Sequence, residues 1–187
     1  MTYLPMLDRP APMDRLKRMA RIMGMVTTVG IGAVVILTVA ALFIPDWTRN
    51  LLLAKLGLAG ADLPVAPSAR LTTAIIIAVP VGVILYGLFA VRALFAEFAR
   101  GHVFTAHNAR CLQVFGATVL AQAPLGPLTT LALTSALTFG NPPGQRMVAV
   151  AFSLNDLFAL ITGGVLYAAA TVMREAARIA DENASFV

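Results

Sequence analysis

IMGMVTTVGIGAVVILTVAALFI, residues 22–44, is an apolar run of 23 residues without a charge. A helix needs about 20 apolar residues to cross the hydrocarbon core of a bilayer. Arg21 precedes the run and Pro45-Asp46-Trp47 follows it. A signal peptide has a shorter apolar core, of about 7–15 residues, followed by a small-residue cleavage site. The run therefore predicts an uncleaved transmembrane span.

Three further apolar runs follow, at residues 71–91, 111–138 and 154–173. The composition agrees with four spans, since 59% of the 187 residues are hydrophobic, 12% are charged and the mean hydropathy is +0.83. A typical soluble domain is about 45–50% apolar and about 25% charged. A soluble fold of this length could not bury so much apolar surface. The sequence predicts an all-α integral membrane protein, one domain over residues 1–187 with four transmembrane helices.

Most of the basic residues lie on one side of these spans. Ten of the 14 precede the first span, separate the second from the third or follow the fourth: Arg9, Arg15, Lys17, Arg18, Arg21, Arg92, Arg100, Arg110, Arg174 and Arg178. Because basic flanking segments stay cytoplasmic, we expect both termini in the cytoplasm, a cytoplasmic loop at 92–110 and an outer loop at 45–70. Topology then explains the net charge of +5, and direct nucleic-acid binding is not expected. Arginines at the membrane edge also favour the anionic headgroups of the lipid bilayer.

Prolines fall inside two of the spans. Pro80 lies in the middle of the second span, where it is expected to kink the helix because proline removes a backbone hydrogen bond. The third span holds a stronger interruption, formed by Gln122, Pro124, Gly126 and Pro127. Transporters bind substrates at broken helices near the middle of the membrane, so these four residues are a candidate buried site, and together with Pro80 they form the candidate kink site. The first three spans hold no acid, base or histidine, and a structural kink is therefore favoured over a transport site.

Small residues recur in the spans and offer packing faces, because helices in lipid associate through close contact of small side chains. The alternative is that glycine and alanine are simply frequent there. The candidates are Gly24, Gly30, Gly32, Gly82, Gly87, Gly163, Gly164 and the alanines 168–170. Other membrane helices, of a second copy or of a larger complex, are the partners that such faces imply. Ser153 and Asp156 are expected to cap the start of the fourth span.

The segment 98–110 contains both histidines and directly precedes Cys111, the only cysteine. Helix-forming residues continue the second span for about two turns, and Gly101 is expected to stop it. Thr105 then caps the next helix, with Asn108 at the third position. The two histidines are five residues apart across a turn, so no metal site is expected. Cys111 begins an apolar helix pattern, which indicates a buried small hydrophobe rather than a reactive thiol.

The loop and the C-terminal end resemble a known family. The loop Ala-Arg-Gly-His-Val-Phe-Thr-Ala-His-Asn-Ala-Arg, residues 99–110, resembles an "rG-x-iFt-x-x-N" pattern. The end, from Phe152-Ser-Leu-Asn-Asp156 to Val187, resembles an "fsl…ll…a-x-x-f-r-x-g-x-x-l-x-x-E" ending, with alanine where the family has glycine. Together they are similar to the bacterial four-span membrane proteins called domain of unknown function 2975, mainly over residues 92–187. The resemblance implies an inner-membrane protein without established catalytic residues and, as one role, a membrane partner for a cytoplasmic helix-turn-helix regulator.

The chain lacks a nucleophile–base–orienter set, a phosphate-binding glycine loop and paired catalytic carboxylates. We therefore expect no enzyme activity and no cofactor. The first hypothesis is a docking or regulatory module whose partner binds the cytoplasmic loop. The candidate docking residues are Glu97, Arg100, His102, Phe104, Thr105, His107, Asn108 and Arg110. The alternatives are an accessory subunit of a larger membrane complex and, third, a small transporter or channel.

Overall fold

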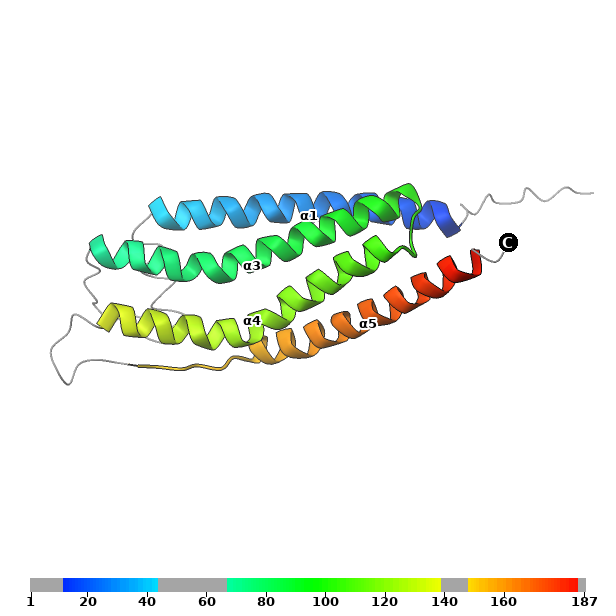
Figure 1. Ribbon diagram of the computed structural model, residues 1–187. Coiled ribbons are helices and arrows are strands. Elements are labelled where there is room, and N and C mark those ends of the chain that lie inside the picture. The colour runs from blue at the N-terminus through cyan, green and yellow to red at the C-terminus, as the bar shows by residue number, and fades with distance from the viewer. Residues whose placement is uncertain (1–11, 44–66, 139–147, 185–187) are drawn as a thin grey trace, which may run out of the picture.

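The computed structural model describes residues 12–43, 67–138 and 148–184. These residues form four helices: α1 (Pro12–Phe43), α3 (Pro67–Arg100), α4 (Ala106–Thr138) and α5 (Leu154–Ala184) (Figure 1). All four are long and apolar enough to cross a membrane. The predicted all-α, four-span architecture is therefore confirmed. The sequence of residues 51–63 in the outer loop, LLLAKLGLAGADL, also suggests a short helix lying on the outer surface, but these residues lie outside the described ranges.

The helices pack in chain order as a single layer. α1 packs on α3, α3 on α4 and α4 on α5, and no other pair of helices is in contact among the described residues. Neighbouring helices run in opposite directions (Figure 1). One end of the layer thus collects the start of α1, the end of α3, the start of α4 and the end of α5. Because 101–105 connects α3 to α4 here, we call this end the elbow end.

The helices are longer than the predicted spans. α3 begins at Pro67, within the predicted outer loop, and proline suits the first turn of a helix because its missing N–H has no partner there anyway. The predicted cytoplasmic loop 92–110 is mostly helical, and only residues 101–105 leave the helix. Extension of the second span by about two turns is confirmed, since α3 ends at Arg100.

The three prolines lie inside continuous helices. α3 runs through Pro80, and α4 runs through Pro124 and Pro127 without a change of helix type. The third span is therefore not unwound at the positions where the sequence suggested an interruption. Bending of the two helices at these prolines stays a prediction.

α4 and α5 approach so closely that their backbones touch. A Cβ atom added at Gly116 would lie 2.7 Å from the backbone nitrogen of Tyr167, and one added at Gly163 would collide with the backbone of Leu120. Such distances leave no room for any side chain. Gly163 was among the predicted packing residues, whereas Gly116 was not. Gly30, Gly32, Gly82 and Gly164 have open space where a Cβ would lie.

An extended segment, residues 148–153, precedes α5 and runs beside the last turns of α4 (Figure 1). The backbone N–H of Ala149 donates to Thr134 Oγ1 at 3.2 Å. The cap predicted at the start of α5 is confirmed. The Ser153 N–H donates to Asp156 Oδ2 at 2.8 Å, and the Asp156 N–H donates to Ser153 Oγ at 3.3 Å. This reciprocal pair satisfies two backbone donors that a helix start leaves free.

Candidate functional site: the elbow and its basic surroundings

The elbow, residues 97–110, begins with a tightly bonded helix end. Gly101 has φ of +94°, a left-handed conformation that side chains disfavour. The Gly101 N–H donates to the Phe98 carbonyl at 3.0 Å, and the His102 N–H donates to the Glu97 carbonyl at 3.1 Å. These two bonds form a Schellman motif, which closes the last turn of a helix. The predicted stop at Gly101 is confirmed.

Asn108 holds the linker against the start of α4. Its backbone N–H donates to Thr105 Oγ1 at 3.2 Å, so the predicted threonine cap is confirmed. Its side chain, however, is fully buried and turns toward the linker. There Nδ2 donates to the carbonyls of His102 at 2.7 Å and Val103 at 3.0 Å. The sequence indicated a helix cap at Asn108, whereas the larger role of its side chain is to fix the turn.

Three charged or titratable side chains meet at the end of α3. Glu97 accepts hydrogen bonds from Arg100 and, at 3.2 Å, pairs with Nδ1 of His102. α3 has 34 residues, more than the about 20 that cross a bilayer core, so this end projects beyond the apolar run 71–91. The hydrogen bond from His102, and secondly that from Arg100, lowers the pKa of Glu97 below its ordinary value of 4.5. Glu97 therefore orients Arg100 and His102, two other members of the predicted docking set.

The outer surface of the elbow carries one aromatic side chain and several cations. Phe104 is 72% exposed, the largest exposed hydrophobic side chain in the linker. His107 and Arg110 are exposed on the first turn of α4, and Arg100 and His102 are exposed beside Glu97. Among the eight predicted residues, Asn108 alone is buried, so it supports the surface rather than forming it. Within the described ranges, no three His, Cys, Asp or Glu side chains meet in an arrangement that could hold a metal ion.

Cys111 lies directly below this surface and is buried, as predicted. Its Sγ is 3.5 Å from Nε2 of His107, one turn earlier on α4. This spacing is the ordinary one between residues four apart on a helix. The pair thus belongs to the packing of the first turns of α4.

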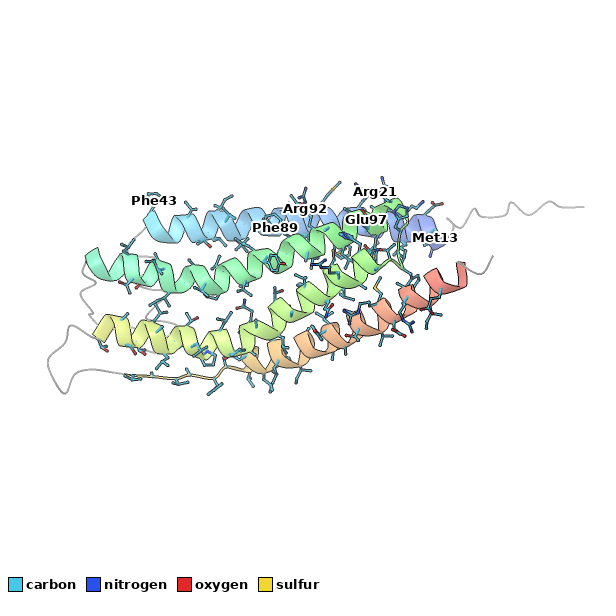
Figure 2. The ribbon with its side chains drawn as sticks, in the orientation of Figure 1. Met13, Arg21, Phe43, Phe89, Arg92 and Glu97 are labelled. Atoms are coloured by element: carbon cyan, nitrogen blue, oxygen red, sulfur yellow. The ribbon has the colours of Figure 1, made fainter. Side chains whose placement is uncertain are left out.

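The first turns of α1 complete the elbow end. A Cβ atom at Gly101 would lie 3.0 Å from Cε of Lys17, so the lysine side chain lies over the glycine. Figure 2 places Arg21, Arg92 and Glu97 toward this end and Phe43 at the opposite end. The described basic residues at the elbow end are Arg15, Lys17, Arg18, Arg21, Arg92, Arg100, Arg110, Arg174 and Arg178, while Arg70 lies at the other end.

A polar cluster joins α4 to α5 just inside the elbow end. Gln113 Nε2 donates to the hydroxyl oxygen of Tyr167 at 2.9 Å. Arg174 Nη1 donates to Gln113 Oε1 at 3.3 Å. One amide therefore fixes two side chains of the neighbouring helix. No local pattern predicts this cluster, because Gln113 is 54 positions from Tyr167 and 61 positions from Arg174.

The second candidate site, around the prolines, does not form one cavity. Gln122 Nε2 donates to the carbonyl of Pro80 at 3.2 Å, which brings the two proline-containing helices together. Gly126 faces the other way, where its Cα lies against the Asp156 carboxylate of α5. Pro124 is exposed and Pro127 is buried. Pro80 and Gln122 thus belong to the α3–α4 contact and Gly126 to the α4–α5 contact.

The comparisons with known proteins identify the family. The model of the family described as "Protein of unknown function (DUF2975)" matches residues 53–187. The match extends the resemblance, expected mainly over 92–187, to include all of α3 with α4 and α5. No curated protein and no solved structure matches the chain. Since the family model covers well over half of the sequence, the chain belongs to the DUF2975 family.

Proposed function

We propose that the protein is a non-enzymatic module of the bacterial inner membrane, with both termini and the elbow in the cytoplasm, and that a regulatory partner docks on the elbow. The orientation is supported by the distribution of charge. The described basic residues gather at the elbow end, with four on α1, two on α3, one on α4 and two on α5. Positively charged flanks of membrane helices remain cytoplasmic.

The single observation that carries the docking proposal is the combination of a fixed backbone and an exposed aromatic side chain. The Schellman motif at Gly101 and the buried Asn108 amide hold both ends of a five-residue linker. Phe104 stands out from that linker with 72% of its surface exposed. A preordered loop loses little conformational entropy on binding. Aromatic and arginine side chains also contribute most of the binding energy at protein interfaces.

The neighbouring charges define what the partner offers. Arg100 and His102 are exposed beside Glu97, four and two positions before Phe104, and Lys17 of α1 reaches Gly101 between them. A partner surface with an apolar pocket and an acidic rim would complement this face. The family resemblance implies a cytoplasmic helix-turn-helix regulator, and such a protein is our proposed partner. Nucleic acid would then be bound by the regulator and not by this chain.

The test is affinity capture of cytoplasmic proteins from native membranes, followed by binding of the recovered partner to purified variants. We expect Phe104→Ser combined with Arg100→Glu to abolish capture. Phe43→Ser is the matched control, because Phe43 is 79% exposed at the opposite end of the layer. Equal recovery by the double variant and the wild-type protein, with the control also unchanged, would refute the elbow as a docking surface.

A second function, an accessory subunit of a larger membrane complex, is favoured by the open layer. α1 contacts only α3 and α5 contacts only α4 within the described part of the chain. Each edge helix therefore retains a face that another protein's helices could cover. Mild extraction at native expression levels tests this role. A particle of monomer or homodimer size would argue against it.

The third function, a small transporter or channel, has the weakest support. Its candidate residues divide between two helix contacts, as Gln122 bonds to Pro80 while Gly126 packs against Asp156. Flux assays in liposomes with a Pro124→Ala/Pro127→Ala variant test this function. Unchanged flux in the variant would exclude these prolines from any pathway.

A further inference from the structure

The arginines at the elbow end fall into two classes. Arg100 pairs with Glu97, and Arg178 pairs with Glu175 and Glu182. These pairs lie in the last turns of α3 and α5. Arg92, Arg110 and Arg174 differ, because none of them makes an ion pair with a carboxylate among the described residues, and the same holds for Arg15, Arg18 and Arg21 of α1. Arg92, Arg110 and Arg174 stand at the ends of the apolar runs 71–91, 111–138 and 154–173.

Arg92, Arg110 and Arg174 lie at one level of the layer. Arg174 bonds to Gln113, so the two residues are level across the α4–α5 contact. Gly87 packs against Thr118 across the α3–α4 contact. α3 and α4 run in opposite directions. Arg92 follows Gly87 by five residues on α3, and Gln113 precedes Thr118 by five residues on α4. Arg92 and Gln113 are therefore level with each other. Arg110 is one turn from Gln113 on the same helix.

This level is the membrane boundary of the proposed topology. Each of the three arginines ends an apolar run about long enough to cross the hydrocarbon core. Lipid phosphates therefore lie at the depth where these side chains lack a carboxylate partner. Anionic headgroups attract basic residues placed here.

α4 and α5 contribute hydrogen-bond donors at this level. Gln113 and Gly116 lie on the α4 face that contacts α5, and Arg110 is one turn before Gln113 on the same helix. Gln113 holds Arg174 and the Tyr167 hydroxyl oxygen in place. The guanidinium of Arg174 uses one donor on Gln113 and retains others, and the Tyr167 hydroxyl keeps its own proton to donate. Guanidinium groups bind phosphate oxygens in bidentate geometry.

We propose that Arg110, Arg174 and Tyr167, positioned by Gln113, form a binding site for the phosphate of an anionic phospholipid in the leaflet at the elbow end. Carboxylates of the protein balance the charges of Arg100 and Arg178. The lipid phosphate balances the charges of Arg110 and Arg174. The acyl chains lie along the apolar surface below these two side chains, which includes Leu160, an exposed residue two turns before Tyr167 on the same side of α5. The site therefore recognises a lipid rather than a soluble anion.

The experiment measures binding of phosphatidylglycerol in mixed micelles to the delipidated, full-length protein in an uncharged detergent. We expect Arg110→Gln/Arg174→Gln to weaken binding by roughly 30-fold, about fivefold for each arginine. Arg100→Gln/Arg178→Gln is the matched control, since it removes the same charge from arginines that already have carboxylate partners. The control should change binding by no more than about twofold.

Three further measurements distinguish binding of an anionic lipid from binding of any lipid or of free phosphate. Phosphatidylcholine should bind much more weakly than phosphatidylglycerol, and sodium phosphate should not compete at millimolar concentration. Arg110→Lys/Arg174→Lys should recover only part of the affinity, because lysine keeps the charge but loses the bidentate hydrogen bonds. Unchanged elution volume and circular dichroism establish that each variant is folded. Equal losses in the two double glutamine variants would overturn the proposal. Binding of phosphatidylcholine as tight as that of phosphatidylglycerol, or full competition by free phosphate, would overturn it as well.

Discussion

The α4–α5 contact and the α1–α3 contact are built differently, although both join long apolar helices. At Gly116 and Gly163 the backbones of α4 and α5 touch, with no room for a Cβ atom. On α1, a Cβ at Gly24 would lie an ordinary 3.8 Å from Cβ of Phe95. The two contacts also differ in their side-chain hydrogen bonds between helices. Gln113 binds two side chains of α5, whereas no side-chain bond between α1 and α3 occurs among the described residues.

The difference indicates which part of the layer is rigid. Lipid is as apolar as the helix surfaces, so helices associate in a membrane through close packing and polar contacts. Both occur between α4 and α5, whereas the described residues show neither between α1 and α3. α1 is held by looser contacts at the edge of the layer, apart from the turn where Lys17 reaches Gly101. We therefore expect α4 and α5 to form the stable part of the fold and α1 to separate first.

The largest expected effect comes from adding one methyl group to the close contact. Gly163→Ala should destabilise the protein by about 3 kcal/mol, because the new Cβ collides with the backbone of Leu120. Gly164→Ala is the matched control, since open space lies beside it. Alanine favours a helix over glycine by about 1 kcal/mol, so the control should be neutral or slightly stabilising. Reversible unfolding in mixed detergent measures both variants.

Opposite signs at two adjacent glycines would establish that space, and not helix propensity, determines the α4–α5 contact. A similar stability for the two variants would show that the helices shift apart at little cost. Gly24→Ala extends the comparison to α1, where we expect no loss because the added Cβ makes an ordinary contact. A loss at Gly24 as large as that at Gly163 would remove the distinction between the two contacts.

The elbow connects the α1–α3 part of the layer to the α4–α5 part. The second prediction concerns the buried side-chain amide of Asn108. Asn108→Ala should cost about 2 kcal/mol, because the carbonyls of His102 and Val103 lose their donor. Amide hydrogen exchange should accelerate over residues 101–108 and stay unchanged in the middle of α5. Asn108→Asp preserves the shape but removes the Nδ2 donor, so it should be no more stable than the alanine variant. Wild-type stability of the aspartate variant would contradict the assigned role.

The sequence predicted the number and order of the helices because long uncharged runs leave few alternatives in lipid. It also predicted the local motifs at Gly101, Thr105 and Ser153, since helix ends depend on residues within a few positions of one another. Contacts across the layer were harder to predict. Gly116 and Gly163 resemble Gly30 and Gly164 in sequence, yet only the first two face a neighbouring backbone. Hydropathy cannot reveal which face of a lipid-exposed helix is covered.

The same limit applies to the candidate sites. Asn108 was identified from its spacing to Thr105, but its bonds to the linker depend on the path of residues 102 and 103. Gln122 was grouped with the nearby prolines of α4, whereas its partner is the Pro80 carbonyl, 42 positions earlier. The Gln113 cluster was missed because a single glutamine at a span boundary carries no pattern. Polar residues inside spans therefore identify contacts, while their partners require the fold.

The third prediction concerns the contact between α3 and α4. Gln122→Leu removes the hydrogen bond to the Pro80 carbonyl and should cost about 0.6 kcal/mol, the average for such bonds between membrane helices. Thr28→Val is the control, because Thr28 bonds within its own helix, to the Gly24 carbonyl. Unfolding in mixed detergent should separate the two variants. A loss approaching that of Gly163→Ala would mean that the α3–α4 contact, and not α4–α5, holds the layer together.

The smallest expected effect is that of the exposed ion cluster at Glu97, and it depends on pH. Hydrogen bonds from His102 and Arg100 place the folded-state pKa of Glu97 below 4.5, so folding favours the ionised carboxylate. Its contribution is complete above pH 4.5 and disappears as the pH falls through the lower, folded-state pKa. Glu97→Gln should therefore lower the thermal midpoint slightly at pH 7 and not at all once the carboxylate is protonated. A difference from the wild-type protein that persists below that pKa would mean that Glu97 contributes by packing, so that the elbow is held by its backbone bonds and Asn108 without help from charge.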